Sequence, residues 1–352
     1  MAKRIRSEEI EETDRLPGFP HPRENFRLLG QDAALARAAR AIRAGRPPQA
    51  WLIAGPPGIG KATIAYRIAR YLLRYGATGE GPEDLSVAAN DPVSIQVTAN
   101  SHPGLLVLKR SVNPDSGRMM TVLGVEVIRR LAGFFGMTSG AGGWRIAIVD
   151  TADDMNEAAA NALLKALEEP PRHSMLMLLA NAPGRLLPTI RSRCQRLDLR
   201  PLGERDLVAG LREYLPETAD RDLQALASLA GGSIGAALAL AGGDGLALAN
   251  DATTLIEQAA SPDVPALMAL ADKIARIGDG LEIFGGFLVQ ALANRIRARA
   301  ATASALQLQR WTEAWESIAA NFARADALHL EPRQTILSSA RAISALARRS
   351  AL

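Results

Sequence analysis

The sequence predicts an α/β fold, with a parallel sheet in the first part of the chain and helices alone in the rest. Short apolar runs alternate with helix-forming segments up to about residue 200, which is typical of right-handed crossovers and of a sheet covered on both faces. After Pro201 no strand-like run remains, and helix-forming sequence continues to residue 352. A glycine-rich turn after the first apolar run adds a phosphate-binding loop to the predicted sheet.

The individual elements follow from these patterns in chain order. Residues 1 to about 28 read as an irregular arm with turn signals, and an Ala- and Arg-rich helix is expected over 33–46. Short apolar runs predict four buried strands, at 50–54, 105–108, 145–149 and 175–180. Further helices are expected at 61–75, 122–135 and 156–168. Residues 76–91 are rich in glycine and acidic side chains and predict a loop.

Glycine and proline breaks divide the helical part of the chain. They fall at Gly231-Gly232, within 242–245, and at Pro262 and Pro265. Such residues end helices, so they mark candidate boundaries. We predict an arm over 1–28, an α/β domain over 29–201, a small helical domain over 202–245 and a larger helical domain over 246–352.

Composition narrows the class of protein. Hydrophobic residues make up 48% and charged residues 22%, which allows a packed core and argues against global disorder. The net charge of +4 comes from interleaved acidic and basic residues, so it permits nucleic-acid contact without requiring it. The single cysteine, Cys194, excludes an intramolecular disulfide and a cysteine-based zinc cluster. The four histidines are scattered, so we predict no metal site.

Targeting signals are also missing from the pattern. The opening residues MAKRIRSEEIEETDR are charged and contain no apolar core of the kind found in signal peptides. No run approaches the roughly 20 apolar residues that a membrane span needs. We therefore expect a cytoplasmic protein without a membrane partner.

The glycine-rich turn has the pattern of a phosphate loop with one departure. Gly55, Gly58 and Gly60 let backbone N–H groups surround phosphate oxygens, and Lys61 reaches the outer phosphates. The pattern requires a hydroxyl directly after the lysine to coordinate magnesium, and that residue is Ala62. Thr63 cannot replace it, because one step along a helix turns a side chain by about 100°. Two interpretations stay open: a loop that holds phosphate but holds Mg-nucleotide poorly, or a relic that only maintains the fold.

A carboxylate ends the third predicted strand. Asp150 stands where such ATPases place the aspartate that organises magnesium. Hydrolysis usually needs a glutamate beside it to orient the attacking water, and Thr151 has no carboxylate. Asp153 and Asp154 are expected to cap the next helix. With two catalytic positions lost, we expect no ATP hydrolysis by this chain.

Four segments carry a resemblance to a known family. In chain order, these segments are Gly30-Gln31, the NALLKALEEPP run at 161–171, Asn181 at the end of a strand, and the PTIRSRC run at 188–194. Their order and spacing are those expected of the family. They resemble the clamp-loader branch of the AAA+ ATPases. The resemblance covers about residues 27–202 and implies a RecA-like domain, a helical lid and a helical collar domain that joins a pentamer. It also implies that Asn181 is the first-sensor residue.

Departures within that branch indicate a type of subunit. Motor subunits (tau/gamma) of that branch keep the hydroxyl after the lysine and an Asp-Glu pair, and usually carry four zinc-binding cysteines. They also carry a second-sensor arginine, and this chain has Gly235 at that position. The chain keeps Ser192, Arg193 and Cys194, the SRC motif, which delta subunits typically lack. It therefore resembles the delta-prime subunits of bacterial DNA polymerase III. Phe134-Phe135-Gly136, Trp311 and Trp315 resemble the alphaproteobacterial type.

The resemblance gives Arg193 a role in trans. A permanently charged, planar guanidinium can stabilise the charge that develops on a phosphoryl group in a neighbouring subunit. Ser192 and Cys194 are expected to fix the loop. The alternative is a surface arginine that pairs with a carboxylate of its own chain.

The implied partners are a motor subunit (tau/gamma) and a delta subunit in a hetero-pentamer of the replisome, with primed DNA and the sliding clamp reached through the complex. We expect no required cofactor and no zinc. Whether the loop holds ATP, ADP or phosphate is left open by the sequence, and we expect it to coordinate magnesium poorly. Two rivals remain: an active ATPase of the same branch, and a stand-alone DNA-binding module.

Overall fold

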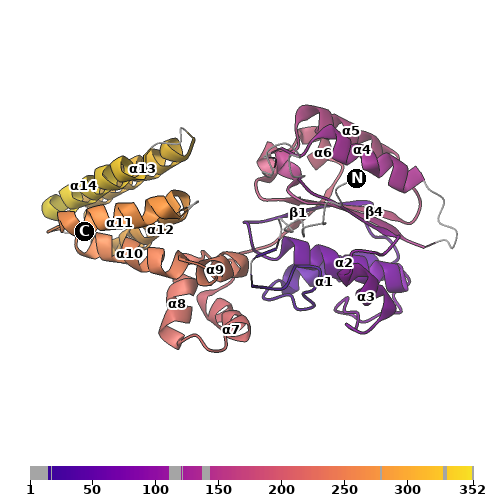
Figure 1. Ribbon diagram of the computed structural model, residues 1–352. Helices are drawn as coiled ribbons and strands as arrows, with labels where there is room; N and C mark the ends of the chain where they lie inside the picture. Colours follow the sequence, from indigo (N-terminus) through magenta and orange to yellow (C-terminus); the bar gives the residue numbers. More distant parts are fainter. Residues whose placement is uncertain are drawn as a thin grey trace, which may run out of the picture. The chain divides into compact units, whose positions relative to one another are not determined.

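The computed structural model describes residues 15–16, 18–110, 120, 122–136, 143–277, 280–327 and 331–350. The first 14 residues of the predicted arm therefore lie outside the described residues. The chain separates into two compact units, Met1–Leu238 and Ala239–Leu352 (Figure 1). The finer division into arm, α/β domain, lid and collar stays a prediction.

The first unit is built on a five-stranded parallel sheet with the strand order β2-β3-β4-β1-β5. The strands are β1 (Ala50–Ala54), β2 (Leu105–Leu108), β3 (Arg145–Val149), β4 (Ser174–Ala180) and β5 (Gln195–Asp198). The first four were predicted. The strand β5 was missed because only Leu197 in it is buried, so it has no apolar run. Because β1 pairs with β4 in parallel, the loop after β1 lies beside the residues that follow β4.

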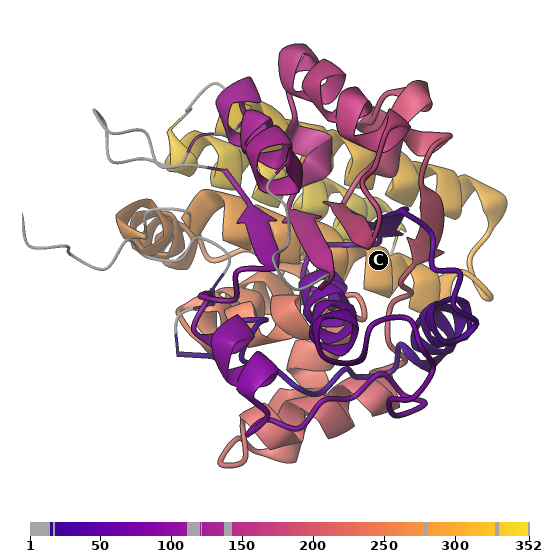
Figure 2. The same cartoon turned by 90° about the vertical axis from the view of Figure 1, so that its right-hand side faces the viewer.

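Helices cover both faces of this sheet, as the alternation of strands and helices predicted (Figures 1 and 2). One face packs against α1 (Asp32–Arg43) and α2 (Lys61–Tyr75), and the other against α4 (Val125–Gly136) and α5 (Glu157–Glu168). Side chains alternate along each strand, so Ile53 of β1 belongs to the first core and Leu52 to the second. The remaining short elements are α3 (Pro92–Thr98), α6 (Pro188–Arg191) and the 3₁₀ turns η1 (Ala152–Asp154) and η2 (Pro183–Arg185).

Helix α3 was not predicted, because its seven residues are too few for a helical period to show. Local chemistry explains it. The Asp91 carboxylate accepts a hydrogen bond from the Val93 backbone N–H at 2.8 Å, and Pro92 occupies the first helical position. The helix expected over 122–135 also begins later than predicted, at Val125.

The sheet continues into α7 (Glu204–Tyr214), α8 (Asp220–Leu229) and α9 (Ile234–Ala241). Gln31 ties the start of the fold to this connection. Its side chain, 3% exposed, donates to the Arg200 carbonyl at 2.8 Å and accepts from the Arg200 N–H at 3.2 Å. The predicted break at Gly231-Gly232 is real, since both glycines have left-handed backbone and separate α8 from α9.

The second unit is helical throughout its described residues. Its helices are α10 (Gly245–Glu257), α11 (Val264–Arg276), α12 (Gly280–Arg299), α13 (Ala305–Ala327) and α14 (Pro332–Ser350). Trp311 is buried and the Trp315 indole N–H donates to the Val289 carbonyl at 2.9 Å, so both are packing residues. Among the described residues, no helix is both long enough and apolar enough to cross a membrane.

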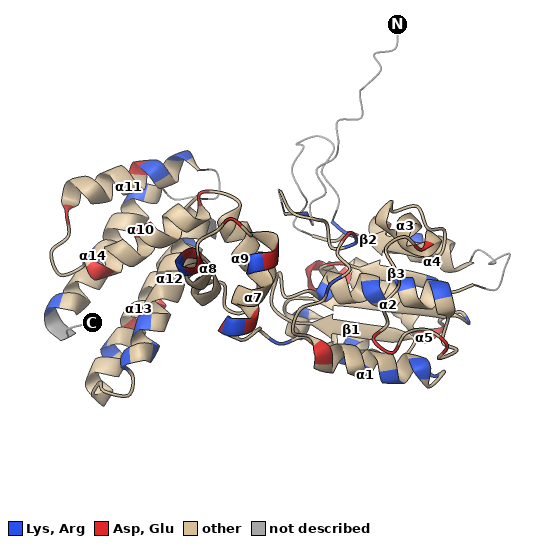
Figure 3. Cartoon of the chain, turned by 90° about the horizontal axis from the view of Figure 1, so that it is seen from below, with Lys and Arg blue, Asp and Glu red and all other residues tan. Residues whose placement is uncertain are grey.

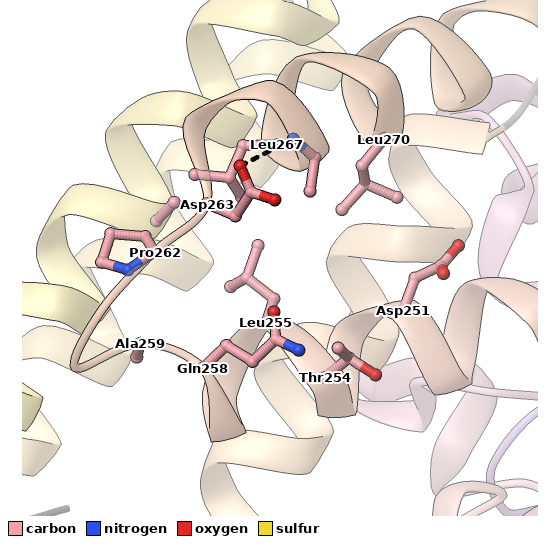
Figure 4. A pocket seen from close by; sticks show the side chains of 11 residues that line it. Asp251, Thr254, Leu255, Gln258, Ala259, Pro262, Asp263, Leu267 and Leu270 are labelled. Carbon is pink, nitrogen blue, oxygen red and sulfur yellow. Dashed lines mark hydrogen bonds between the residues drawn. The ribbon is translucent and has the colours of Figure 1, made fainter.

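A small cavity of about 130 Å³ lies between α10 and α11 in this unit (Figure 4). Leu255, Leu267 and Leu270 are among its apolar lining residues. The Asp263 carboxylate at its edge caps α11 by accepting from the Ala266 N–H at 3.4 Å (Figure 4). The polar group at this edge is thus explained by helix capping.

Candidate nucleotide site and exposed arginine

The phosphate loop has the context that the sequence predicted. It leaves β1 at Gly55 and opens α2 at Lys61. Gly58 and Gly60 have φ of +69° and +104°, a region that favours glycine. Ala62, which stands at the predicted magnesium position in the first turn of α2, packs against the core, and Thr63 is buried. The loop is therefore built as a phosphate loop, but the residue after its lysine has no hydroxyl.

Lys61 is held entirely by its own chain. Its Nζ donates to the carbonyl oxygens of Gly55 at 2.8 Å and Pro56 at 2.7 Å, and to Asn181 Oδ1 at 2.7 Å. An ammonium group has three donors, so all of them are used. Burial lowers the pKa of Lys61 to about 8, and the charges of Asp150 and Asp153 oppose this effect in part. A phosphate reaches this lysine only if these hydrogen bonds break.

The acidic strand end has the predicted carboxylate and an unusual neighbour. Asp150 directly follows β3 and accepts a hydrogen bond from the Thr151 N–H at 2.9 Å. Thr151 has φ of +48°, a left-handed conformation that β-branched residues rarely adopt. Thr151 offers no carboxylate at the position where the sequence pattern of hydrolysing ATPases predicts a glutamate. The site thus keeps the aspartate and has no adjacent base.

The prediction that Asp153 caps the next helix was wrong. Asn156 caps α5, accepting from the Ala159 N–H at 2.8 Å. The Asp153 carboxylate, 7% exposed, instead accepts from the N–H groups of Asn181 at 3.1 Å and Ala182 at 2.8 Å. It therefore joins the ends of β3 and β4 and sets the position of the asparagine that binds Lys61. Local spacing could not reveal this, because the partner lies 28 residues away.

Asp154 does not cap α5 either. Its carboxylate lies 3.4 Å from Arg110 and 3.6 Å from Arg185, which are ion-pair distances. The two neighbouring aspartates thus do different work: Asp153 receives backbone N–H groups, and Asp154 pairs with arginines.

The beginning of α9 lies directly on the phosphate loop. The Ser233 hydroxyl donates to the Pro57 carbonyl at 2.8 Å, and the Gly235 N–H donates to the Gly58 carbonyl at 2.9 Å. A Cβ atom on Gly235 would lie 2.7 Å from the Gly58 Cα, and one on Gly58 would lie 2.6 Å from the Ser233 hydroxyl. Such close approach is possible only between two glycines. Gly235, which the resemblance places at the second-sensor position, therefore packs its backbone on the loop.

Arg193 follows α6 and has an exposed side chain, with 38% of its surface accessible. Its Nη2 donates to Glu168 Oε1 at 2.9 Å, and its Nη1 donates to the Thr189 carbonyl at 3.1 Å. The alternative of an arginine paired within its own chain is thus realised, in a solvent-exposed form. Exposed ion pairs stabilise proteins by about 0–1 kcal/mol.

The two other residues of the SRC motif shape the loop. The Ser192 hydroxyl donates to the Thr189 carbonyl at 3.1 Å. Cys194 is half-buried, and burial raises the pKa of its thiol to about 11, so the thiol stays protonated at neutral pH. With Gln49 and Gln195 the motif lines a hollow of about 300 Å³, which leaves the Arg193 guanidinium accessible.

The predicted site residues lie at opposite ends of the parallel strands. Lys61, Asp150 and Asn181 meet where β1, β3 and β4 end. Arg193 lies where β1 and β5 begin, since Gln195 pairs with Trp51 and Arg193 lines the same hollow as Gln49. A strand of five residues spans roughly 15 Å at about 3.3 Å per residue. Arg193 therefore cannot reach a phosphate held by the loop of its own chain.

Comparison with known proteins points to one family. Residues 30–203 match the family described as "DNA polymerase III, delta subunit". DNA polymerase III subunit delta' of Escherichia coli is 36% identical over 204 residues, and that of Pseudomonas aeruginosa 35% over 185 residues. These alignments cover 58% and 52% of this chain, and 58% and 53% of the relatives. The chain thus spans about half the length of the curated relatives it matches.

The same region also matches another type of subunit. DNA polymerase III subunit gamma/tau of Mycobacterium tuberculosis is 34% identical over 190 residues, which is 52% of this chain and 29% of that protein. Among solved structures, a gamma subunit-related protein of Thermotoga maritima covers 90% of this chain and 98% of its own, with 20% identity and a TM-score of 0.47. At that score the fold assignment depends on the strand order given above. Overall identity does not separate the two types of subunit.

Proposed function

We propose that the chain is a delta-prime-type subunit of a bacterial clamp loader, and the match of residues 30–203 to the DNA polymerase III delta-subunit family supports this. In this role it supports ATP hydrolysis in an adjacent motor subunit (tau/gamma) and cleaves no ATP itself. A delta subunit completes the complex, which loads the sliding clamp onto primed DNA. The protein then works in the cytoplasmic replisome and meets DNA and clamp mainly through its partners.

One observation carries the proposal: Arg193 lies where the parallel strands begin, and the phosphate loop lies where they end. The guanidinium is exposed beside a hollow, so a phosphate of another molecule can approach it. Lys61 of the same chain is separated from Arg193 by the length of β1. An arginine placed in this way can act on a nucleotide only in trans.

The state of the chain's own loop supports the second half of the proposal. All three Lys61 donors are used internally, Gly235 packs on Gly58, and neither Ala62 nor Thr151 supplies the group that hydrolysis needs. Each feature weakens nucleotide binding or cleavage by a different route. Their combination favours a loop that maintains the fold over one that turns over ATP.

The ion pair with Glu168 does not oppose a trans role. An arginine that contacts a transferred phosphoryl group typically contributes about 10³ to 10⁵ in rate, which is roughly 4–7 kcal/mol. The exposed pair contributes about 0–1 kcal/mol. The guanidinium therefore gains far more from the transition state than it loses when the pair weakens.

Reconstitution with motor and delta subunits tests the proposal. We expect Arg193→Ala to preserve assembly, measured by size-exclusion chromatography, and to lower ATPase activity stimulated by primed DNA and clamp at least tenfold. Arg196→Ala is the matched control, because Arg196 is also exposed and also pairs with a carboxylate, at 2.6 Å from Asp198. Native turnover in the Arg193→Ala complex would remove the proposed role.

The two rival functions make different predictions. An active ATPase predicts Mg-ATP turnover by the isolated chain that Lys61→Ala abolishes. A DNA-binding module predicts steeply salt-dependent DNA affinity of the isolated chain. Figure 3 shows acidic and basic positions on the same helices, α7 and α11 among them, whereas α2 carries basic positions only.

A further inference from the structure

We infer that Glu168 is a positioning residue, which holds the Arg193 guanidinium ready for a phosphate of the neighbouring subunit. The inference rests on the trans role proposed above and assigns a function to a second residue of that site. It starts from the Arg193–Glu168 contact, where Nη2 and Oε1 are 2.9 Å apart.

The donors of Arg193 are divided between anchoring and free positions. A guanidinium carries five N–H donors in one plane. Within the described part of the chain, Glu168 takes one donor from Nη2 and the Thr189 carbonyl takes one from Nη1. One donor on each of Nη1, Nη2 and Nε is left. The two anchors fix the plane of the group, and the three remaining donors can bind phosphate oxygens.

The location of Glu168 is unfavourable unless the residue has a partner. It is the last residue of α5, and Pro170-Pro171 prevent the helix from continuing. A carboxylate at the C-terminal end of a helix meets the negative end of the helix dipole. The Arg193 cation offsets this repulsion. The pair thus has a fixed carboxylate on a helix end and a cation on a short loop.

Positioning has a physical benefit for an arginine. A long side chain loses much rotamer freedom when it is immobilised, and this loss opposes transition-state binding. Anchors that already order the guanidinium in the resting state reduce the loss at the moment of reaction. Half of the Glu168 side chain is exposed, so the pair is weak enough for the guanidinium to adjust when phosphate arrives.

Glu169 provides a matched control. It is the next residue, it is also exposed, and among the described residues it takes part in no ion pair. Glu169→Ala therefore removes a carboxylate from the same helix end without touching Arg193. Glu168→Gln keeps an oxygen that accepts a hydrogen bond but removes the charge, and Glu168→Asp keeps the charge but shortens the reach by one methylene group.

The test measures kcat and KM for ATP in the complex reconstituted with motor and delta subunits, primed DNA and clamp. We expect Glu168→Ala to lower kcat about fivefold, or about 1 kcal/mol, with KM changed less than twofold. Glu168→Gln should keep most of the native kcat, because its amide oxygen still accepts from Nη2. Glu168→Asp should lower kcat about threefold, and Glu169→Ala should match the native complex.

A double-mutant cycle separates this inference from the proposed function. In the Arg193→Ala background, Glu168→Ala should have no further effect on kcat, because it acts through the arginine. If Arg193→Ala lowers kcat and Glu168→Ala and Glu168→Asp leave it native, the positioning role is wrong and the trans role stands. If Arg193→Ala leaves kcat native, the proposed function itself fails.

A rise in kcat on removing the carboxylate would also overturn the inference, since it would mean that Glu168 restrains the arginine. Should Glu168→Ala disturb assembly, Glu168→Gln and Glu168→Asp decide between the two roles. Positioning expects the amide to be nearly native and the shortened acid to be slower. Restraint by charge expects the amide to be faster and the shortened acid to be native or faster.

Discussion

Lys61 and Arg193 lie at opposite ends of the strands of one parallel sheet, separated by the length of β1. Lys61 is saturated by its own chain, whereas Arg193 is exposed and held by two weak contacts. The fold thus separates a phosphate loop whose lysine is hydrogen-bonded within the chain from an accessible cation. This separation underlies the proposed division of labour between the chain and a neighbouring motor subunit.

The pKa of Lys61 gives the first prediction. Burial lowers it from 10.5 to about 8, so the native protein releases this proton before the unfolded chain does. The buried charge therefore opposes folding below about pH 8, by about 3 kcal/mol, and the penalty fades as pH rises towards 10.5. The chain has five lysines, so NMR of ¹³C-labelled lysine can resolve the Lys61 Cε signal. Lys61→Arg assigns it, and titration near pH 10.5 would contradict the account.

Separating α9 from the phosphate loop is the second prediction. Gly235→Ala places a Cβ 2.7 Å from the Gly58 Cα, so the two backbones must move apart. Overpacking of this kind costs about 1–3 kcal/mol, and we expect amide exchange of residues 55–60 and 233–238 to accelerate about 10- to 100-fold. Hydrogen-exchange mass spectrometry measures it. Gly184→Ala, which meets no atom within 4 Å, is the control and should exchange as the native protein does.

Thr151 offers a stabilising substitution. Its φ of +48° is unfavourable for a β-branched residue and acceptable for asparagine. We expect Thr151→Asn to stabilise the first unit by about 0.5–1 kcal/mol and to raise its Tm by about 2 °C. Differential scanning calorimetry is the measurement, and Thr151→Val, which keeps the branch, should give no gain. A lower Tm for Thr151→Asn would show that the threonine is not strained.

Asp153 and Asp154 should differ sharply when each is replaced by alanine. Asp153→Ala leaves the N–H groups of Asn181 and Ala182 without their acceptor, which costs about 2–3 kcal/mol of stability. Asp154→Ala removes two longer ion pairs and should cost about 1 kcal/mol or less. Chemical denaturation of both variants tests this order. Equal losses would contradict the role assigned to Asp153.

The sequence revealed the elements whose signals are local. Buried strands such as β1 and β3 are continuous apolar runs, and the phosphate loop has a fixed spacing of glycines before Lys61. The elements it missed lack such signals: β5 has three exposed side chains and a single buried leucine, and α3 depends on one capping contact. Contacts distant in sequence, such as Asp153 with Asn181 and Gly235 with Gly58, depend on the folded topology and on no local pattern.

Comparison of Lys61→Ala with Arg193→Ala in the same reconstituted complex tests the central claim most directly. The measurement is the rate of ATP hydrolysis stimulated by primed DNA and clamp, at equal assembly of both complexes. The account predicts a rate within twofold of native for Lys61→Ala and a fall of at least tenfold for Arg193→Ala. The reverse order, with loss at the lysine and native turnover without the arginine, would contradict it.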